Sequence, residues 1–157
     1  MGGDCISTTE RSKYNVDLKN KSTRTFDGIV FDSAGEMKMY RDWLLPKLLS
    51  GEVIDIQRQK SYVLQRAFER NGKKQLPITY VADFVVTYAN GETIVYDFKG
   101  MPDAVAKLKR KMFWNLYPEL ELQWIAYSKI DGGYVPYEVV QEGRKERRKA
   151  KKNKENK

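Results

Sequence analysis

Hydrophobic and polar residues alternate most regularly between positions 78 and 99, where two strand-like runs flank Ala89-Asn90-Gly91 and favour a hairpin. A two-residue turn would place Asp83 opposite Phe98, whereas a three-residue loop places Asp83 opposite Asp97. The three-residue register gathers the large apolar residues on one face, and a slip of one residue would expose that face. We therefore predict a hairpin in which Asp83 and Asp97 are paired. Its apolar face comprises Tyr80, Ala82, Phe84, Val86, Ile94, Tyr96 and Phe98.

The remaining periodicities predict two helices and further strands. Ser33 has the character of an N-cap, and apolar residues then recur at helical spacing as far as Pro46, which ends or kinks the helix. Pro102 and Asp103 suit the first turn of a second helix. The apolar stripe of this second helix consists of Val105, Leu108, Met112 and Leu116. Strands are expected at 26–31, 53–56, 60–68, 120–127 and 134–140, with a turn at Asn71-Gly72.

This order of elements indicates the fold class. A strand, a helix, several strands, a second helix and a further strand are typical of an α/β domain with a mixed central sheet flanked by helices. At 157 residues the chain has the length of one domain, and no repeat or Pro- or Gly-rich linker divides it. We expect a flexible N-terminal arm at 1–25, a folded domain at 26–141 and a basic disordered tail at 142–157.

The composition excludes several kinds of active site. The chain has no histidine, which excludes Ser-His-Asp and Cys-His catalysis, His-metal nucleases, Cys₂His₂ fingers and HExxH zinc sites. Its one cysteine, Cys5, cannot form an intramolecular disulfide, so nothing indicates secretion. No apolar run is long enough to span a bilayer, and no signal-peptide pattern is present. We expect a cytoplasmic protein with no membrane partner.

The positive charge is concentrated at the C-terminus. Of the formal net charge of +8, nine basic residues against two acidic ones from Gly143 onward contribute +7, and the rest of the chain contributes +1. This tail, which includes Arg147 and Arg148, is typical of a polyanion-binding arm, although a solvated end has the same composition. In the second helix a basic group can track DNA phosphates or form an ordinary exposed face. It consists of Lys107, Arg110 and Lys111.

The predicted hairpin also brings together residues that can carry chemistry. Asp83 and Asp97 lie side by side, and Lys99 follows on the same face. Two adjacent carboxylates repel each other, so a proton, a basic partner or a divalent cation must offset them. Oxygen ligands of this kind suit Mg²⁺ or Mn²⁺, and Lys99 can hold an attacking hydroxide or a scissile phosphate. From the residues alone, a surface ion pair on the hairpin remains the alternative.

These residues resemble the PD-(D/E)xK nuclease superfamily. The resemblance rests on Glu36 in the first helix, then Asp83, then Asp97-Phe98-Lys99, and it covers roughly Ser12 to Tyr127. Ala82 stands where the superfamily's name has proline. Within the superfamily, the chain resembles a phage-borne family of uncharacterised proteins related to Holliday-junction resolvases and RecB-type nucleases. The matching stretches are Ser12-Lys13-Tyr14, Phe31-Asp32-Ser33, Gln59, Tyr80-Val81-Ala82-Asp83-Phe84 and Asp97-Phe98-Lys99-Gly100.

The resemblance implies a restriction-endonuclease-like αβββαβ core and a metal-dependent endonuclease that hydrolyses phosphodiester bonds, on branched or recombination-intermediate DNA. Asp83 and Asp97 would bind Mg²⁺ or Mn²⁺, and Lys99 would be the catalytic lysine. Glu36 would be a further metal ligand, but Ser33-x-x-Glu36 is also a capping box that engages the same carboxylate. Gln59 would support the site or contact DNA.

The resemblance also bears on partners and on the alternative function. By analogy, a homodimer with two active sites would suit a symmetric junction, and a phage-encoded member would act in the cytoplasm of its bacterial host. The alternative is a non-catalytic nucleic-acid-binding or phage assembly protein that retains the nuclease fold. The presence of all four candidate residues favours catalysis, because a decayed nuclease usually loses one. These residues are Glu36, Asp83, Asp97 and Lys99.

Overall fold

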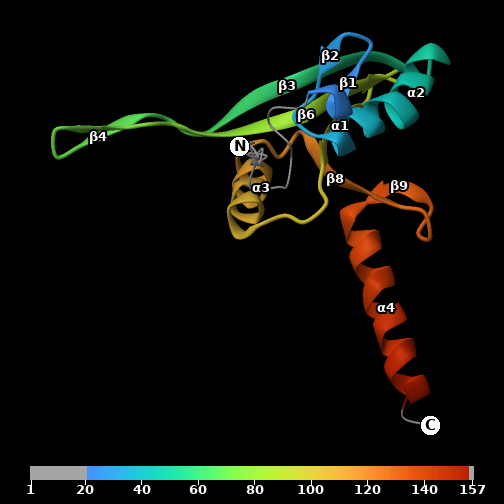
Figure 1. Cartoon of the computed structure of the whole chain (residues 1–157). Coiled ribbons are helices and arrows are strands. Elements are labelled where there is room, and N and C mark those ends of the chain that lie inside the picture. Colours follow the sequence, from blue (N-terminus) through green and yellow to red (C-terminus); the bar gives the residue numbers. More distant parts are fainter. Residues whose placement is uncertain (1–20, 156–157) are drawn as a thin grey trace, which may run out of the picture.

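The computed structural model describes residues 21–155 and shows a mixed α/β fold (Figure 1). A five-stranded sheet forms its centre, in the order β3-β6-β7-β8-β9. The pair β7/β8 is parallel, and the other neighbours are antiparallel. The predicted fold class, a mixed central sheet flanked by helices, is confirmed. The strands are β3 (Val53–Gln65), β6 (Ile78–Tyr88), β7 (Thr93–Phe98), β8 (Glu121–Ser128) and β9 (Gly133–Pro136).

Helices cover both faces of this sheet. On one face, α1, η2 and α2 pack through a core cluster that includes Met37, Phe84 and Tyr96. On the other face, α3 packs through a second cluster that includes Phe113 and Val95. The succession α1, β3, β6, β7, α3, β8 matches the expected αβββαβ order. The helices are α1 (Ala34–Met39), the π-helix η2 (Tyr40–Leu44), α2 (Leu45–Leu49), α3 (Ala104–Leu116) and α4 (Tyr137–Glu155).

The chain that leads into α1 is folded from residue 22 onward. A 3₁₀-helix, η1 (Ser22–Arg24), precedes a small hairpin of β1 (Thr25–Phe26) and β2 (Ile29–Val30), which replaces the single strand predicted at 26–31. Arg24 is buried, and its guanidinium donates to the carbonyl oxygen of Phe31. The predicted flexible arm is therefore wrong for residues 22–25, because Arg24 finds a buried acceptor. Residues 1–20 of that arm lie outside the described residues.

The first helix begins and bends where the sequence indicates. Ser33 is the N-cap of α1, and its side chain accepts a hydrogen bond of 3.0 Å from the backbone N–H of Glu36. Pro46 lies at the start of α2, directly after the π-helical turn. Proline has no backbone N–H to donate to the preceding turn, and the hydrogen-bond pattern changes to π-helical directly before it. The helical run therefore continues through Pro46 to Leu49.

The β6–β7 hairpin has the three-residue register. Tyr88 donates a backbone hydrogen bond of 2.8 Å to Glu92, and the loop between them includes Gly91 with φ of +86°. The ladder pairs Phe84 with Tyr96, and the same register places Asp83 opposite Asp97. The prediction that these two acids face each other across the hairpin is confirmed.

The apolar face of that hairpin is split between two clusters, which corrects the prediction of a single face. Phe84 packs with the α1 side, whereas Tyr80 and Ala82 pack with the α3 side. The change from one cluster to the other occurs at Asp83, whose carboxylate accepts the backbone N–H of Phe98 at 2.8 Å. The β6–β7 ladder ends at this point, and β6 continues with β3 alone.

Strand β3 is also longer than predicted. The two expected strands at 53–56 and 60–68 form one strand that runs through the polar joint to Gln65. Gln59 has a left-handed backbone, with φ of +52°, and it is left out of the pairing between its neighbours and β6. A single irregular residue of this kind bends a strand without ending it.

The C-terminal region is helical where a strand and a disordered tail were predicted. The strand expected at 134–140 ends at Pro136, and α4 follows as far as Glu155. The prediction of disorder is therefore wrong for residues 142–155. The run is rich in Lys, Arg and Glu, which have high helix propensity, and its acidic first turn and basic last turn complement the helix dipole.

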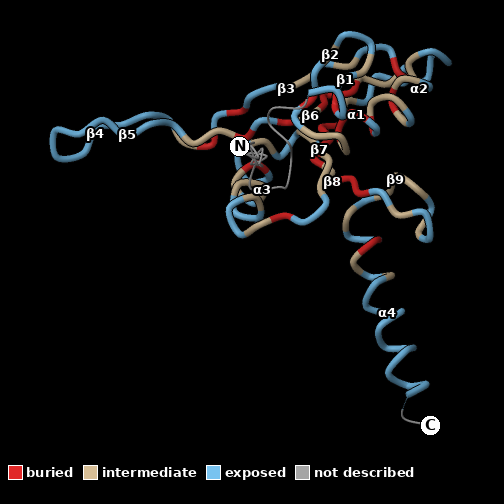
Figure 2. The backbone as a smooth tube through the Cα atoms, viewed as in Figure 1, coloured by how far each residue is buried: buried red, intermediate tan, exposed pale blue. Residues whose placement is uncertain are grey.

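Most of the predicted apolar stripe of α3 faces solvent. Val105 and Leu108 are 57% and 59% exposed, whereas Phe113 is fully buried against the sheet. Of the stripe, Met112 packs against the core beside Phe113, so hydrophobic spacing predicted the buried face only at this position. Exposed residues dominate α4 and the ribbon of β4 (Phe68–Arg70) and β5 (Lys73–Gln75), as Figure 2 shows. Among the described residues, 21–155, no helix is both long enough and apolar enough to cross a membrane.

Candidate active site

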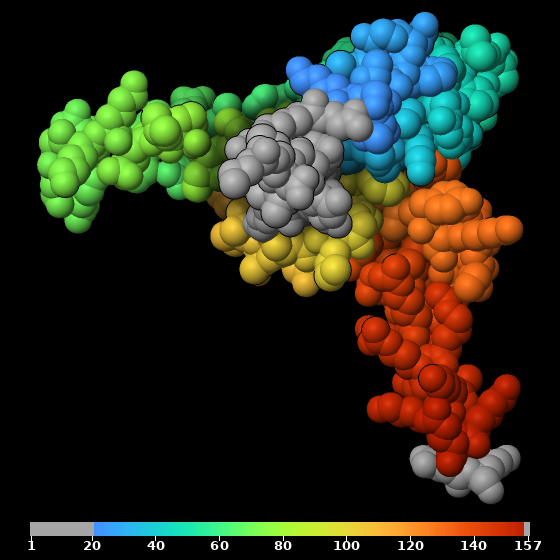
Figure 3. Space-filling view, viewed as in Figure 1, coloured from blue at the N-terminus to red at the C-terminus, as the bar shows by residue number. Residues whose placement is uncertain are grey.

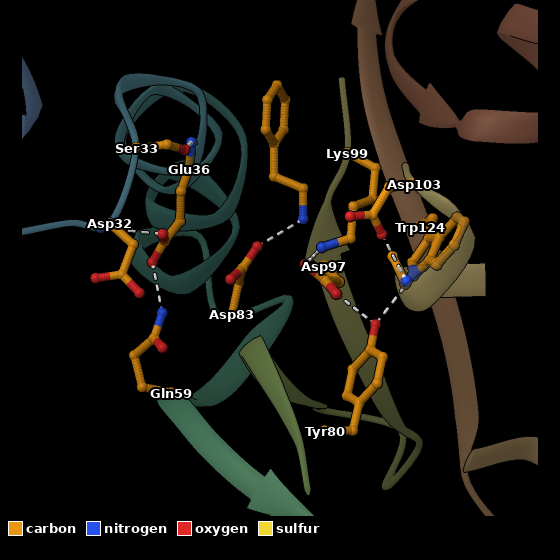
Figure 4. Close-up of polar contacts among 12 residues, drawn as sticks. Asp32, Ser33, Glu36, Gln59, Tyr80, Asp83, Asp97, Lys99, Asp103 and Trp124 are labelled. Atoms are coloured by element: carbon orange, nitrogen blue, oxygen red, sulfur yellow. Dashed lines mark hydrogen bonds and ion pairs between the residues drawn. The ribbon is translucent and has the colours of Figure 1, made fainter. Parts of the chain in front are cut away.

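Asp83 and Asp97 lie side by side at the point where β6 and β7 separate (Figure 4). Asp97 is buried, with 2% of its surface exposed. It pairs with Trp124 of β8 in the parallel ladder, so it has a neighbouring strand on both sides. The geometry therefore holds two carboxyl groups close together inside the sheet, as the sequence predicted.

Asp97 is held by a cation and by a phenol. The Nζ atom of Lys99 lies 2.9 Å from Oδ1 of Asp97, and the hydroxyl of Tyr80 donates to Oδ2. That hydroxyl in turn accepts a hydrogen bond of 2.9 Å from the indole Nε1 of Trp124. Burial and the charge of Asp97 raise the pKa of Tyr80, so this hydroxyl remains a donor. The orientation of Asp97 is thus fixed by residues from three strands.

Sequence reasoning missed Tyr80 and Trp124 as parts of the site. Tyr80 was assigned only to the apolar face of the hairpin. Its hydroxyl contacts Asp97 from the part of β6 that lies beyond the ladder to β7 and pairs with β3 alone. The chain carries ten tyrosines, and no spacing distinguishes this one.

The surroundings of Asp83 disfavour its charged form. Burial raises its pKa well above the usual value, and the charge of Asp97 and a hydrogen bond between the two side chains raise it further. Glu36 acts in the same direction, and Lys99 opposes the effect. One ammonium thus faces two carboxyl groups, so their negative charge is only partly offset, which favours uptake of a proton or a cation.

Glu36 is buried but lies apart from this pair, against the start of its own helix. Its Oε2 atom accepts the backbone N–H of Asp32 at 3.2 Å, and its Oε1 atom accepts a hydrogen bond of 3.1 Å from Gln59. The guanidinium of Arg58 lies 4.0 Å from the same carboxylate. Burial raises the pKa of Glu36, and the Gln59 hydrogen bond partly offsets this.

Of the two roles predicted for Glu36, the structure shows the capping contact. Ser33 accepts from the N–H of Glu36, and the Glu36 carboxylate returns to the backbone one residue before Ser33, at Asp32. Gln59 reaches the same carboxylate because its left-handed backbone sits opposite Asp83 in the register. Gln59 is thus a neighbour of the candidate site through its contact with Glu36.

A three-carboxylate metal centre is not assembled. Within residues 21–155 no group of three His, Cys, Asp or Glu side chains is arranged to hold a metal ion. Two carboxylates remain, Asp83 and Asp97, and their oxygen donors and only partly offset charge fit a hard divalent cation that keeps several waters. The residues present therefore fit Mg²⁺ or Mn²⁺ with two protein ligands.

A cavity of about 310 Å³ opens beside Asp97 and Lys99. It lies between the end of β7 and the first turns of α3, where Asp103 caps the helix by accepting the N–H of Ala106 at 2.8 Å. Lys109 of α3 also lines it. Acidic and basic side chains thus share one opening at the carboxyl end of β7.

The basic residues predicted to bind DNA fall into two groups. Arg110 is engaged inside the fold: its guanidinium lies 3.6 Å from the centre of the Trp124 ring and 2.6 Å from the Glu138 carboxylate. Arg147 forms a bidentate pair with Asp131, with distances of 2.6 and 3.0 Å. The other three of the predicted set are exposed, namely Lys107, Lys111 and Arg148.

Comparison with known proteins gives one match. A family model described as "Protein of unknown function (DUF1064)" matches residues 11–131. No curated protein and no solved structure matches the chain. The matched stretch contains every residue of the candidate site, from Glu36 to Trp124, and it ends before α4 begins.

Proposed function

The chain belongs to the DUF1064 family of proteins of unknown function, and we propose that it is a metal-dependent endonuclease that hydrolyses phosphodiester bonds in DNA. The observation that carries this proposal is the pairing of Asp83 with Asp97, with the Lys99 ammonium 2.9 Å from Asp97. Asp97 and Lys99 line one cavity, and Asp83 lies beside Asp97 in the hairpin. Two carboxylates and a lysine in this arrangement supply the charges that phosphodiester hydrolysis requires without histidine.

Each residue of the site has a defined task in this proposal. Asp83 and Asp97 supply oxygen ligands for Mg²⁺ or Mn²⁺. When bound, the cation would acidify a water molecule and withdraw negative charge from the phosphate. Lys99 lies at the edge of the pair, where its ammonium stabilises charge that develops on a phosphate oxygen. Tyr80 fixes the direction of the Asp97 carboxylate.

Membership of the PD-(D/E)xK superfamily is part of the same proposal. It is supported by the αβββαβ succession and by the position of Asp97-Phe98-Lys99 at the end of the second strand of the hairpin. Glu36 is not a metal ligand in this proposal, since it does not form a three-carboxylate group with Asp83 and Asp97 and instead accepts hydrogen bonds from Asp32 and Gln59. It acts as a buried support for the α1 side of the site.

The substrate we propose is duplex or branched DNA. Helix α3, whose first turns border the cavity, carries the exposed cations Lys107 and Lys111, and Lys109 lines the cavity itself. Such residues bind the phosphate backbone without reading sequence. A homodimer with two such sites acting on a symmetric junction, and action in the cytoplasm where DNA is accessible, belong to the proposal.

The test is cleavage of end-labelled four-way junction, flap, duplex and single-stranded DNA with Mg²⁺, with Mn²⁺ and with EDTA. We expect Asp97→Asn and Lys99→Gln each to lower cleavage by roughly 10²–10³-fold, while the fold and DNA binding in EDTA persist. Glu92→Gln is the matched control, because it removes an exposed carboxylate from the turn of the same hairpin.

Equal cleavage by wild type and Asp97→Asn would remove the nuclease assignment. DNA binding by a wild-type protein that cleaves none of the four substrates would favour the non-catalytic alternative, a nucleic-acid-binding or phage assembly protein with this fold.

A further inference from the structure

Residues 66–77 form a projecting β-ribbon, which we call the arm. Strand β4 (Phe68–Arg70) pairs with β5 (Lys73–Gln75) around a two-residue turn, Asn71-Gly72. Both turn residues have positive φ, +52° and +69°, as a tight type I′ turn requires. All residues of the arm are exposed (Figure 2). Figures 1 and 3 show it extending away from the body as a continuation of β3 and β6.

The arm carries an excess of basic side chains, although Glu69 lies opposite Lys74. It contains Arg66, Arg70, Lys73 and Lys74 against a single acid, Glu69. Arg70 lies directly opposite Lys73 next to the turn. Like charges in directly opposed positions destabilise a strand pair. Within the described part of the chain neither of these two cations has a carboxylate partner, so residues 21–155 do not offset this repulsion.

Apolar side chains of the arm are exposed as well. Phe68 is 49% and Leu76 is 75% exposed. A two-stranded ribbon on its own is only marginally stable in water. A partner that complements the basic and apolar side chains of the arm therefore carries negative charge and also offers apolar contacts.

The base of the arm is firmly held, which fixes its direction. Tyr62 of β3 packs edge-on against Phe113 and Tyr117, with ring centres 5.0 and 5.3 Å apart. The Tyr117 hydroxyl donates a hydrogen bond of 2.9 Å to the carbonyl oxygen of Val63. Helix α3, which borders the candidate active site, thus holds the part of β3 from which the ribbon projects.

The length of the arm matches a dimension of duplex DNA. Eleven residues separate Gly72 at the tip from Asp83, which at the usual strand rise corresponds to about 36 Å. One turn of B-DNA spans about 34–36 Å. The major groove is about 12 Å wide and admits a two-stranded ribbon, with phosphates on both rims and thymine methyl groups on its floor.

We propose that the arm lies in the major groove of duplex DNA, about one helical turn away from the phosphate held at the acidic pair. The groove is the proposed occupant because it offers both the negative charge that Arg70 and Lys73 lack and the apolar contacts that suit Phe68. A second copy of the arm would instead bring like charges together. The distance to the held phosphate rests on the proposed function; the binding of the groove does not.

The test compares DNA binding by the full chain in EDTA, so that it is independent of cleavage. The probe is a duplex of mixed sequence, several helical turns long. For the double variant Arg70→Gln/Lys73→Gln, we expect the plot of the log binding constant against log salt concentration to become less steep. The magnitude of its slope should decrease by about 2 relative to wild type. The matched control, Arg70→Lys/Lys73→Arg, keeps both charges and should keep the wild-type slope.

Methylation of guanine N7 by dimethyl sulfate reports the groove. Wild type should reduce N7 methylation of guanines along the duplex relative to free DNA, and the double glutamine variant should lose this protection. An unchanged salt slope together with unchanged N7 protection would overturn the proposal. Loss of a wild-type dimer in the variant, without change in DNA binding, would overturn it in favour of a second copy. A wild type that protects the groove but never cleaves DNA supports the arm and contradicts only the nuclease.

Discussion

The ring of Phe98 occupies the space that a Cβ atom would fill at Gly35. A Cβ built on Gly35 would lie 2.1 Å from Cε1 of Phe98, far inside any real contact. Phe98 stands between Asp97 and Lys99, and its backbone N–H donates to Asp83. The contact between α1 and the end of β7 therefore sets the position of the candidate site.

Gly35→Ala should destabilise the protein, because the Phe98 ring has to move. Overpacking of this kind costs about 1–3 kcal/mol in the free energy of unfolding. With Phe98→Ala already present, the sign should reverse, since alanine has the higher helix propensity and gains up to about 1 kcal/mol. Urea unfolding of both single variants and the double variant checks this. Destabilisation by Gly35→Ala in both backgrounds would show that the clash is not its cause.

The sequence was sufficient for the register of the hairpin, and the reason is physical. Alternation of apolar residues and a Gly-containing loop act on the same few residues, and only one register satisfies both. That register alone brings Asp83 and Asp97 together. Local patterns therefore predicted the part of the site that depends on one hairpin.

Features that depend on distant contacts were not predictable. Hydrophobic spacing on α3 selected Val105 and Leu108, but the helix instead buries Phe113 and lays the Arg110 guanidinium flat on Trp124. A planar cation can cover an aromatic ring, and a hydropathy pattern counts it as polar. The Gln59 contact with Glu36 likewise depends on a left-handed residue within β3.

Without metal, the raised pKa of Asp83 should make stability fall as pH rises. The folded state holds this proton to a higher pH than the unfolded state, where the pKa is about 3.9. Between these two pKa values the folded state binds more protons, so the free energy of unfolding decreases with pH and then stays low. Glu36 shifts in the same direction and adds to the decline.

Asp83→Asn should remove the larger part of this decline and stabilise the metal-free protein at neutral pH. Asparagine still offers an oxygen to the N–H of Phe98, so the hydrogen bond at this position is kept. Thermal unfolding in EDTA from pH 4 to 8 measures the effect. Mg²⁺ should raise the wild-type Tm and leave that of the variant unchanged. A variant less stable than wild type at neutral pH in EDTA would contradict the raised pKa of Asp83 as the cause of the decline.

Two adjacent arginines of α4 should respond differently to the same substitution. Arg147 pairs with Asp131 and, with Ser128, lowers the pKa of that carboxyl to about 2. Arg148 is exposed, and within residues 21–155 it has no carboxylate partner. Arg147→Gln should therefore raise the Asp131 pKa towards 3.8, as measured by NMR titration of its carboxyl carbon.

The loss of the pair also removes a contact that anchors α4 to the β8–β9 turn. In Arg147→Gln, the stability that this pair contributes above the unfolded pKa, and that wild type loses as pH falls through about 2, should be absent. Arg148→Gln should leave the Asp131 pKa unchanged and instead lower the salt slope of DNA binding by about 1, as expected for one lost phosphate contact. An equal Asp131 pKa in both variants would mean that Arg147 does not hold α4 through this carboxylate.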